Sequence, residues 1–183
     1  GKQALMIDGT SNAATITIGN TRTAGFNVMA GNSTNAEIKN GIKIEDGSSA
    51  IISGNFIGTN NAGTLVPGNG GESHDGVFIA GDNVLIRGNV LAGSYGQIDD
   101  SDVGLVSIRS LAANTLLKGN FFGMLPDGTA LGTNNVGVID QGSGTIIGTA
   151  AVEDRNFFGN LTIAISAKGS TGTPVVNNYI GVR

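Results

Sequence analysis

The densest group of chemically reactive side chains in the sequence is an acidic run. It contains Asp99, Asp100 and Asp102, so three carboxylates fall within four residues. Carboxylate oxygens are ligands that Ca²⁺ prefers, and the run is therefore a candidate calcium site. Two carboxylates can also act as the acid and the base of glycoside cleavage. A solvated acidic loop is the commoner role of such a run, and the sequence alone leaves all three interpretations open.

Few basic or imidazole groups could complete a catalytic site with this run. Arg109 and Arg87 could meet it across neighbouring repeats, as the base of a lyase must, or could pair with other exposed acids. Arg109 joins the first two aspartates of the run as a candidate catalytic residue. The only histidine, His74, precedes Asp75. This pair could bind a metal or act in catalysis, but a polar loop is the commoner role of its Gly- and Ser-containing segment.

A repeat supplies the elements that must position these groups. In its strict form Asn is followed by two apolar residues and Gly, and a looser form has an extra Ala before the Gly. The strict copies begin at Asn55, Asn120, Asn156 and Asn178, and the looser copies at Asn27 and Asn89. Successive copies are roughly 20 to 36 residues apart, which is the range of stacked-repeat architectures.

Each repeat predicts two or three short strands that cannot bury their own apolar face. Stacking the copies about 4.8 Å apart pairs each backbone with its neighbours and builds a continuous core of Ile, Val, Leu and Phe. Asn suits the turns because it adopts positive φ angles at low cost, and stacked Asn side chains can hydrogen-bond to one another. The aromatic residues of the repeats are expected to stack inside the core: Phe56, Phe121, Phe122, Phe157, Phe158 and Tyr179.

The sequence therefore predicts an all-β fold, a parallel β-helix or solenoid of roughly seven to eight rungs at about 22 to 25 residues per rung. We expect a single domain over residues 1–183, as a segment of a longer solenoid or as a filament subunit. The competing architecture is an antiparallel sandwich. It would need several two-residue Asn-Gly hairpins, and only Asn40-Gly41 offers that turn.

Composition narrows the class of protein. Of the 183 residues 31 are Gly, 39% are hydrophobic, 13% are charged, and the net charge is −4. Disorder goes with low hydrophobicity and high net charge, so this chain is expected to fold. The absence of basic stripes argues against nucleic-acid binding, and no run approaches the roughly 18 apolar residues of a membrane span. The absence of Cys excludes disulfides and thiolate metal sites.

The repeats carry a resemblance to a known group of proteins. Their pattern, Gly-Asn, an apolar pair, Gly and a polar loop with Gly-Thr, resembles the Asn- and Gly-rich repeats of bacterial secreted and surface proteins. These are similar to the pectate-lyase-like superfamily of right-handed parallel β-helices. The resemblance covers about Thr15 to Val182, and the matching residues are turn and core positions. It implies a right-handed coil, a conclusion that the spacing alone does not reach.

Enzymes of that superfamily cleave acidic polysaccharides with an Asp pair, or with Asp-bound calcium, together with a basic residue. The Gly-His-Gly and Arg-Ile-Lys motifs of polygalacturonase-like members are absent from this sequence. The resemblance is therefore specific for the fold and much less so for an activity.

The expected function is that of a non-catalytic structural or adhesive module of a bacterial surface or matrix protein, located outside the cell or on its surface. Such a module could assemble into fibres through its ends. The alternative is a polysaccharide lyase or glycoside hydrolase acting on acidic polysaccharide, and a third possibility is a glycan-binding spike. Calcium is the one cofactor considered. The expected partners are further copies of the chain, end to end, and glycans.

Overall fold

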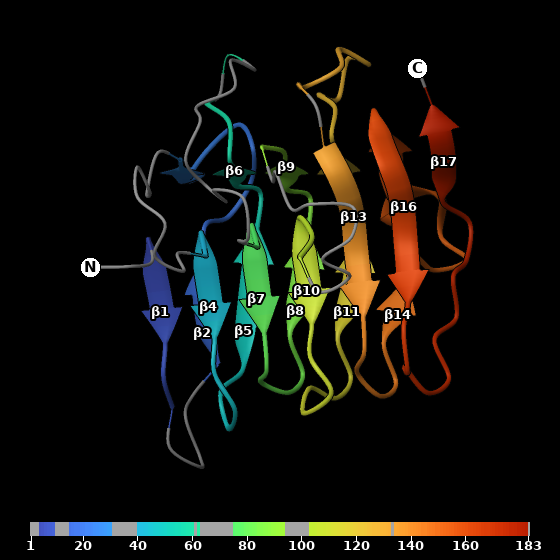
Figure 1. Ribbon diagram of the computed structural model, residues 1–183. Coiled ribbons are helices and arrows are strands. Elements are labelled where there is room, and N and C mark those ends of the chain that lie inside the picture. Colours follow the sequence, from blue (N-terminus) through green and yellow to red (C-terminus); the bar gives the residue numbers. More distant parts are fainter. Residues whose placement is uncertain are drawn as a thin grey trace.

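The structure is a computed structural model, and it describes residues 4–9, 15–30, 40–60, 62, 75–93, 103–132 and 134–182. The chain is all-β, as predicted, and its strands form three parallel sheets (Figure 1). The described residues include one short 3-10 helix, Val152–Asp154, and no α-helix.

Up to β16, sheets A, B and C take every third strand of the chain, and β17 then joins sheet C directly, because the last turn has no strand in sheet B. Sheet A contains β1 (Leu5–Ile7), β4 (Ile42–Ile44), β7 (Val77–Ile79), β10 (Val106–Ile108), β13 (Asn134–Asp140) and β16 (Leu161–Ala167). Sheet B contains β2 (Ile16–Ile18), β5 (Ala50–Ser53), β8 (Leu85–Arg87), β11 (Leu116–Lys118) and β14 (Ile146–Ile147). Sheet C contains β3 (Val28–Met29), β6 (Phe56–Ile57), β9 (Val90–Leu91), β12 (Phe121–Phe122), β15 (Phe157–Gly159) and β17 (Tyr179–Val182).

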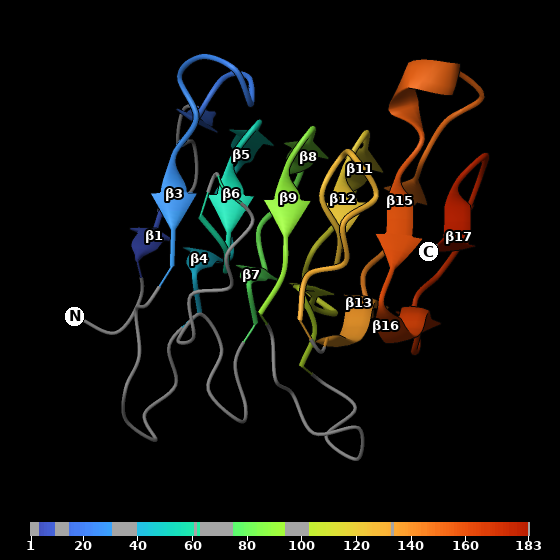
Figure 2. The same cartoon turned by 90° about the horizontal axis from the view of Figure 1, so that it is seen from above.

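Three consecutive strands, one in each sheet, form a unit that we call a triplet. Strands pair in parallel with their counterparts in the next triplet, except that β14 is followed in sheet B only by an isolated bridge from Ile147 to Val175. The strands of sheet C lie side by side in chain order (Figure 2). The sheets hold six, five and six strands in the described part of the chain, fewer than the seven or eight predicted rungs. The difference arises because most repeats are longer than the predicted 22 to 25 residues; Asn120 and Asn156, which are neighbours in the ladder, are 36 residues apart.

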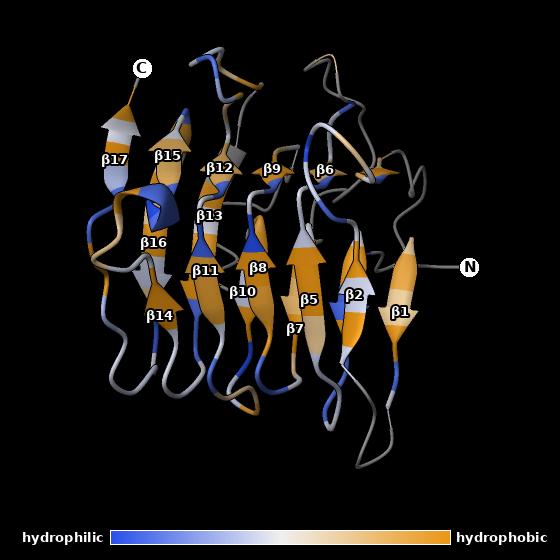
Figure 3. Ribbon diagram, turned by 180° about the vertical axis from the view of Figure 1, so that it is seen from behind, coloured by the Kyte–Doolittle hydropathy of each residue, from blue (hydrophilic) through white to orange (hydrophobic). Residues whose placement is uncertain are grey.

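The core lies between the three sheets. Side chains alternate along each strand, and in β4 the two isoleucines are buried while Lys43 is partly exposed on the opposite face. The strands are accordingly more hydrophobic than the turns that join them (Figure 3). Complete burial of one Ile or Leu side chain stabilises a fold by about 1.5–3 kcal/mol, so the inward rows supply the main driving force for folding.

The aromatic residues of sheet C form two rows instead of one. Phe122 and Phe158 stack inside the core with ring centroids 4.5 Å apart. Phe121 and Phe157 stack on the outer face, 4.9 Å apart, in a second apolar cluster that includes Phe56. The expectation that all these rings lie inside is therefore wrong for the first residue of each pair, because adjacent residues of a strand point to opposite faces.

Asn residues of the repeat form a hydrogen-bonded ladder in the turn between sheets B and C. From the second triplet onward, the Oδ1 atom of each ladder Asn accepts the backbone N–H and the Nδ2–H of the Asn in the preceding triplet, at 2.8–3.2 Å. Each Nδ2 beyond the first also donates to a backbone carbonyl near the end of a sheet B strand, at 2.7–2.9 Å. The ladder runs through Asn27, Asn55, Asn89, Asn120, Asn156 and Asn178.

Stacked Asn side chains were predicted, but the reason given for Asn in the turn is only partly right. None of the ladder residues has a positive φ angle. In three triplets the preceding glycine does: Gly54, Gly88 and Gly119 have φ angles of 68°, 64° and 64°. Asn is thus selected at the ladder by its amide, which both donates and accepts hydrogen bonds, while glycine supplies the left-handed backbone conformation.

Replacing Asn120 with Ala is expected to lower the free energy of unfolding by about 3 kcal/mol, because buried N–H groups of Asn89 and the carbonyl of Ile86 lose their partner. Asn20→Ala is the matched control, since Asn20 is exposed and its side chain makes no hydrogen bond to a described residue. Urea unfolding followed by circular dichroism measures both variants. Equal stability of the two would show that the ladder adds nothing net to the fold.

Candidate functional site

The acidic run lies outside the described residues. Asp99, Asp100 and Asp102 all belong to residues 94–102, and His74 belongs to another stretch outside the described residues, 63–74. The calcium site and the acid–base pair therefore stay predictions. Within the described ranges, no three His, Asp or Glu residues lie close enough together to hold a metal ion.

Arg109 is described, and its partner is a buried acid of the preceding triplet. Arg109 follows β10, and its Nη2 lies 3.5 Å from Oδ2 of Asp75, which lies two residues before the start of β7. The other carboxylate oxygen of Asp75 accepts the backbone N–H of Gly104 at 3.0 Å and a short hydrogen bond from the Ser107 hydroxyl. Arg87, the other candidate base, donates from Nε to the hydroxyl of Ser53.

An aromatic ring completes this cluster on the outer face of sheet A. The guanidinium carbon of Arg109 lies 5.0 Å from the centroid of Phe78, and Nζ of Lys43 lies 5.3 Å from it. The two cations come from the triplets on either side of the ring. Cation–π contacts of this kind stabilise by about 0.5–2 kcal/mol. They partly compensate Arg109, whose buried Nε has no hydrogen-bond partner among the described residues.

The chemistry open to this cluster is limited by burial. Ser107 is 0% exposed and Asp75 is 3% exposed, so a polymeric substrate cannot reach either group in this conformation. A carboxylate that accepts hydrogen bonds from a hydroxyl, a backbone amide and a guanidinium is well suited to fixing neighbouring triplets in register. The cluster therefore positions strands of sheet A.

A second buried carboxylate was not singled out from the sequence. Asp140 is inward-facing in β13, in a row that elsewhere carries Ile44, Ile79 and Ile108. Its oxygens accept hydrogen bonds from the backbone of Gly142 and from two threonine hydroxyls, Thr145 and Thr173, at 2.5–3.0 Å. The sequence does contain a signal for this carboxylate, because Asp140 occupies a position at which the other repeats have an apolar residue.

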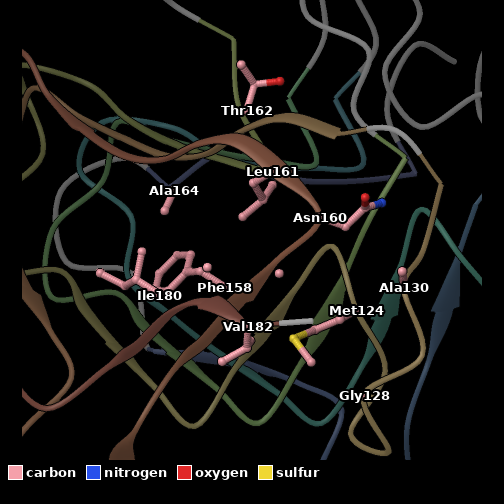
Figure 4. Close-up of a pocket in the computed structure, with 12 residues that line it drawn as sticks. Met124, Gly128, Ala130, Phe158, Asn160, Leu161, Thr162, Ala164, Ile180 and Val182 are labelled. Carbon is pink, nitrogen blue, oxygen red and sulfur yellow. The ribbon is translucent and has the colours of Figure 1, made fainter.

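Two hollows lie at the two ends of the stack of triplets. The C-terminal one has a volume of about 770 Å³, and Figure 4 shows the side chains of Phe158, Leu161 and Met124 around it. The N-terminal one has a volume of about 710 Å³ and is lined by residues of the first triplet, among them Leu5 and Val28. Both have a mixed lining of apolar side chains and polar groups, in which the apolar part comes from the rows of core side chains.

Exposed apolar side chains surround these hollows. At the first triplet they are Met6, Ile16 and Val28, and at the last they are Ile163, Val175, Val176, Tyr179 and Ile180. Ile180 belongs to the inward row of sheet C, in register with Phe158, and is nevertheless 55% exposed. The ends are thus the places where the described apolar rows are least covered.

Comparison of the chain with models of protein families, with curated proteins and with solved structures finds no match. In the part of the chain that the structure describes, no helix has the length and apolar character needed to cross a membrane.

Asp75→Ala is expected to lower the free energy of unfolding by about 3 kcal/mol, because it leaves the partly buried Arg109 and the donors of Ser107 and Gly104 without their acceptor. Asp46→Ala removes the same charge from an exposed turn and is the matched control. Thermal unfolding measured at several salt concentrations compares the two. If both variants unfold together, the Asp75 cluster does not hold the strands in register.

Proposed function

We propose that the chain is a right-handed parallel β-helix that acts as a non-catalytic structural or adhesive module of a bacterial surface or matrix protein, outside the cell. Strand order supports the coil, since consecutive strands from β1 to β16 visit sheets A, B and C in turn and the triplets pair in parallel with one another. A right-handed path is the one that parallel crossover connections take in nearly all proteins. The repeated turns and core positions resemble those of bacterial exoproteins.

The observation that carries the proposed assembly role is the polarity of the Asn ladder. Each ladder Asn donates toward the next triplet and accepts from the previous one. At the N-terminal end, no described residue donates to Oδ1 of Asn27, and at the C-terminal end no described residue accepts the backbone N–H of Asn178. One end therefore offers an acceptor and the other a donor in the same row.

The apolar rows match in the same way. Extending the register of each sheet by one strand would place Leu5 of a second copy over Ile165 of the first. It would place Ile18 over Val175 and Met29 over Ile180. Any further triplet of this repeat would fit either end. For the 183-residue chain in solution, that triplet would come from a second copy of the chain.

End-to-end assembly is tested by light scattering after size exclusion and by negative-stain imaging over a range of concentrations. We expect filaments one molecule wide that lengthen with concentration. Val28→Lys at one end and Ile180→Lys at the other should each stop elongation, because a charge would be buried against an apolar row. Leu111→Lys, on an exposed turn between sheets A and B, is the matched control and should leave filaments intact.

Mixing the two end variants tests the direction of stacking. The Val28→Lys chain keeps an intact C-terminal end, and the Ile180→Lys chain keeps an intact N-terminal end. Head-to-tail stacking therefore predicts a one-to-one dimer that goes no further. A monomer at all concentrations for the unaltered chain would rule out assembly. Cleavage of polyuronate by the chain, with or without Ca²⁺, would instead favour the lyase or hydrolase and direct attention to Asp99, Asp100, Asp102 and Arg109.

A further inference from the structure

A third hollow, of about 490 Å³, contains much of the chain's positive charge. It lies at the turn from sheet B to sheet C, on the side of the molecule. Arg22, Arg87 and Lys118 line it, which are three of the ten Lys and Arg residues of a chain whose net charge is −4. We call this hollow the basic groove.

The floor of the basic groove is built by the register of sheet B. Ser53, Arg87 and Lys118 are aligned in three successive triplets at the ends of β5, β8 and β11. Glycine follows each of them, and all three glycines have positive φ angles. A Cβ atom on Gly54 would lie 2.5 Å from the backbone of Thr21, so glycine is needed for the loop before β3 to lie against this row.

The guanidinium group of Arg22 is held in place from two sides. Its Nη1 donates to the carbonyl of Gly88 at 2.8 Å, and its central carbon lies 4.7 Å from the ring centroid of Phe121. Arg22 thus reaches from the first triplet across to the third and fourth. Partial burial lowers the pKa of Arg22 below its ordinary value, because the charged form loses part of its hydration. Its Nε and Nη2 have no acceptor among the described residues.

One nitrogen of the Arg87 guanidinium group is hydrogen-bonded, and the other two have no acceptor among the described residues. Its Nε donates to the hydroxyl of Ser53 at 3.1 Å, and that hydroxyl in turn donates to the carbonyl of Asn20. Neither terminal nitrogen of Arg87 meets an acceptor in the described part of the chain. The hydrogen bond at Nε therefore fixes the orientation of the side chain, and the two terminal nitrogens, which are both donors, face the basic groove.

The acids at the C-terminal end of the groove do not neutralise these two arginines. Asp154 pairs with Lys118 at 3.0 Å and also accepts a hydrogen bond from Thr149. Glu153 lines the groove from the exposed surface of the 3-10 helix. Three cations therefore face two carboxylates, and the cations of neighbouring strands, Arg87 and Lys118, repel each other. The excess positive charge lies at the arginine end.

We propose that the basic groove binds an oxyanion group, a carboxylate or sulfate or phosphate, between the guanidinium groups of Arg22 and Arg87. Planar guanidinium donors match the paired oxygens of such groups, and charge-assisted hydrogen bonds to them are among the strongest in proteins. The site lies on the side of the stack and does not require assembly through the ends. For an adhesive module it supplies a lateral contact with an acidic polymer.

Isothermal titration calorimetry of the full 183-residue chain at low ionic strength tests the site with four probes: inorganic sulfate, inorganic phosphate, a uronic-acid trisaccharide and a sulfated trisaccharide. We expect saturable binding of at least one probe at one site per chain. Arg87→Gln should weaken it about tenfold through loss of the charge-assisted hydrogen bonds. Glu153→Gln should strengthen it, because a competing negative charge is removed. Circular dichroism verifies that each variant is folded.

Arg155→Gln is the matched control. Arg155 is held by Asn177 and Tyr179 outside the basic groove, so its replacement should leave affinity unchanged. Binding by a trisaccharide but not by the inorganic ions would assign the oxyanion to a glycan, and the reverse would assign a small-ion site. No heat with any probe, or equal weakening by Arg87→Gln and Arg155→Gln, would overturn the proposal.

Discussion

Much of the structure depends on the need to give every buried polar group in one turn a hydrogen-bond partner. The turn between sheets B and C is buried, and its backbone N–H groups point along the stack where no strand partner is available. An amide side chain solves this problem because it accepts from the triplet before and donates to the triplet after. Four of the six ladder residues have no exposed surface at all. Any slip of one triplet against the next would break these bonds, so the ladder fixes the register of all three sheets.

Once the register is fixed, each row of the stack becomes a separate environment. The row of Ile18, Ile52 and Ile86 is core, whereas the row of Ser53, Arg87 and Lys118 is polar and reaches the surface at Arg87 and Lys118. Loops between the rows can vary in length without disturbing either, because they leave and return at fixed turn positions. Cross-triplet contacts such as Arg109 with Asp75 then arise between residues 34 apart in sequence.

The parts of this structure that could be predicted from the sequence are those that recur. The Asn positions, the short apolar strands and the all-β class follow from six copies of one pattern. The sequence does not show which ring of each Phe-Phe pair lies in the core, because alternation along a strand is compatible with either residue facing inward. The partner of Arg109 and the contact of Arg22 with Phe121 could not be predicted, because both depend on which residues of neighbouring triplets lie side by side. The unequal lengths of the repeats hide that register in the sequence. Asp140 was missed because a single departure from a repeat looks like ordinary variation until its three donors are seen.

The direction of the Asn ladder has an electrostatic consequence. At each of the five steps of the ladder, one amide oxygen faces the preceding triplet and accepts an Nδ2–H that faces the following triplet. The second N–H of each Nδ2 beyond the first turns back to a carbonyl of the preceding triplet and opposes this alignment only in part. The dipoles of the ladder amides therefore add along the axis of the stack, as peptide dipoles do in a helix, and each one polarises its neighbours. The C-terminal end is the positive pole and the N-terminal end the negative pole. Opposite poles attract, so two such stacks approaching along their axis are oriented in the same direction before they touch.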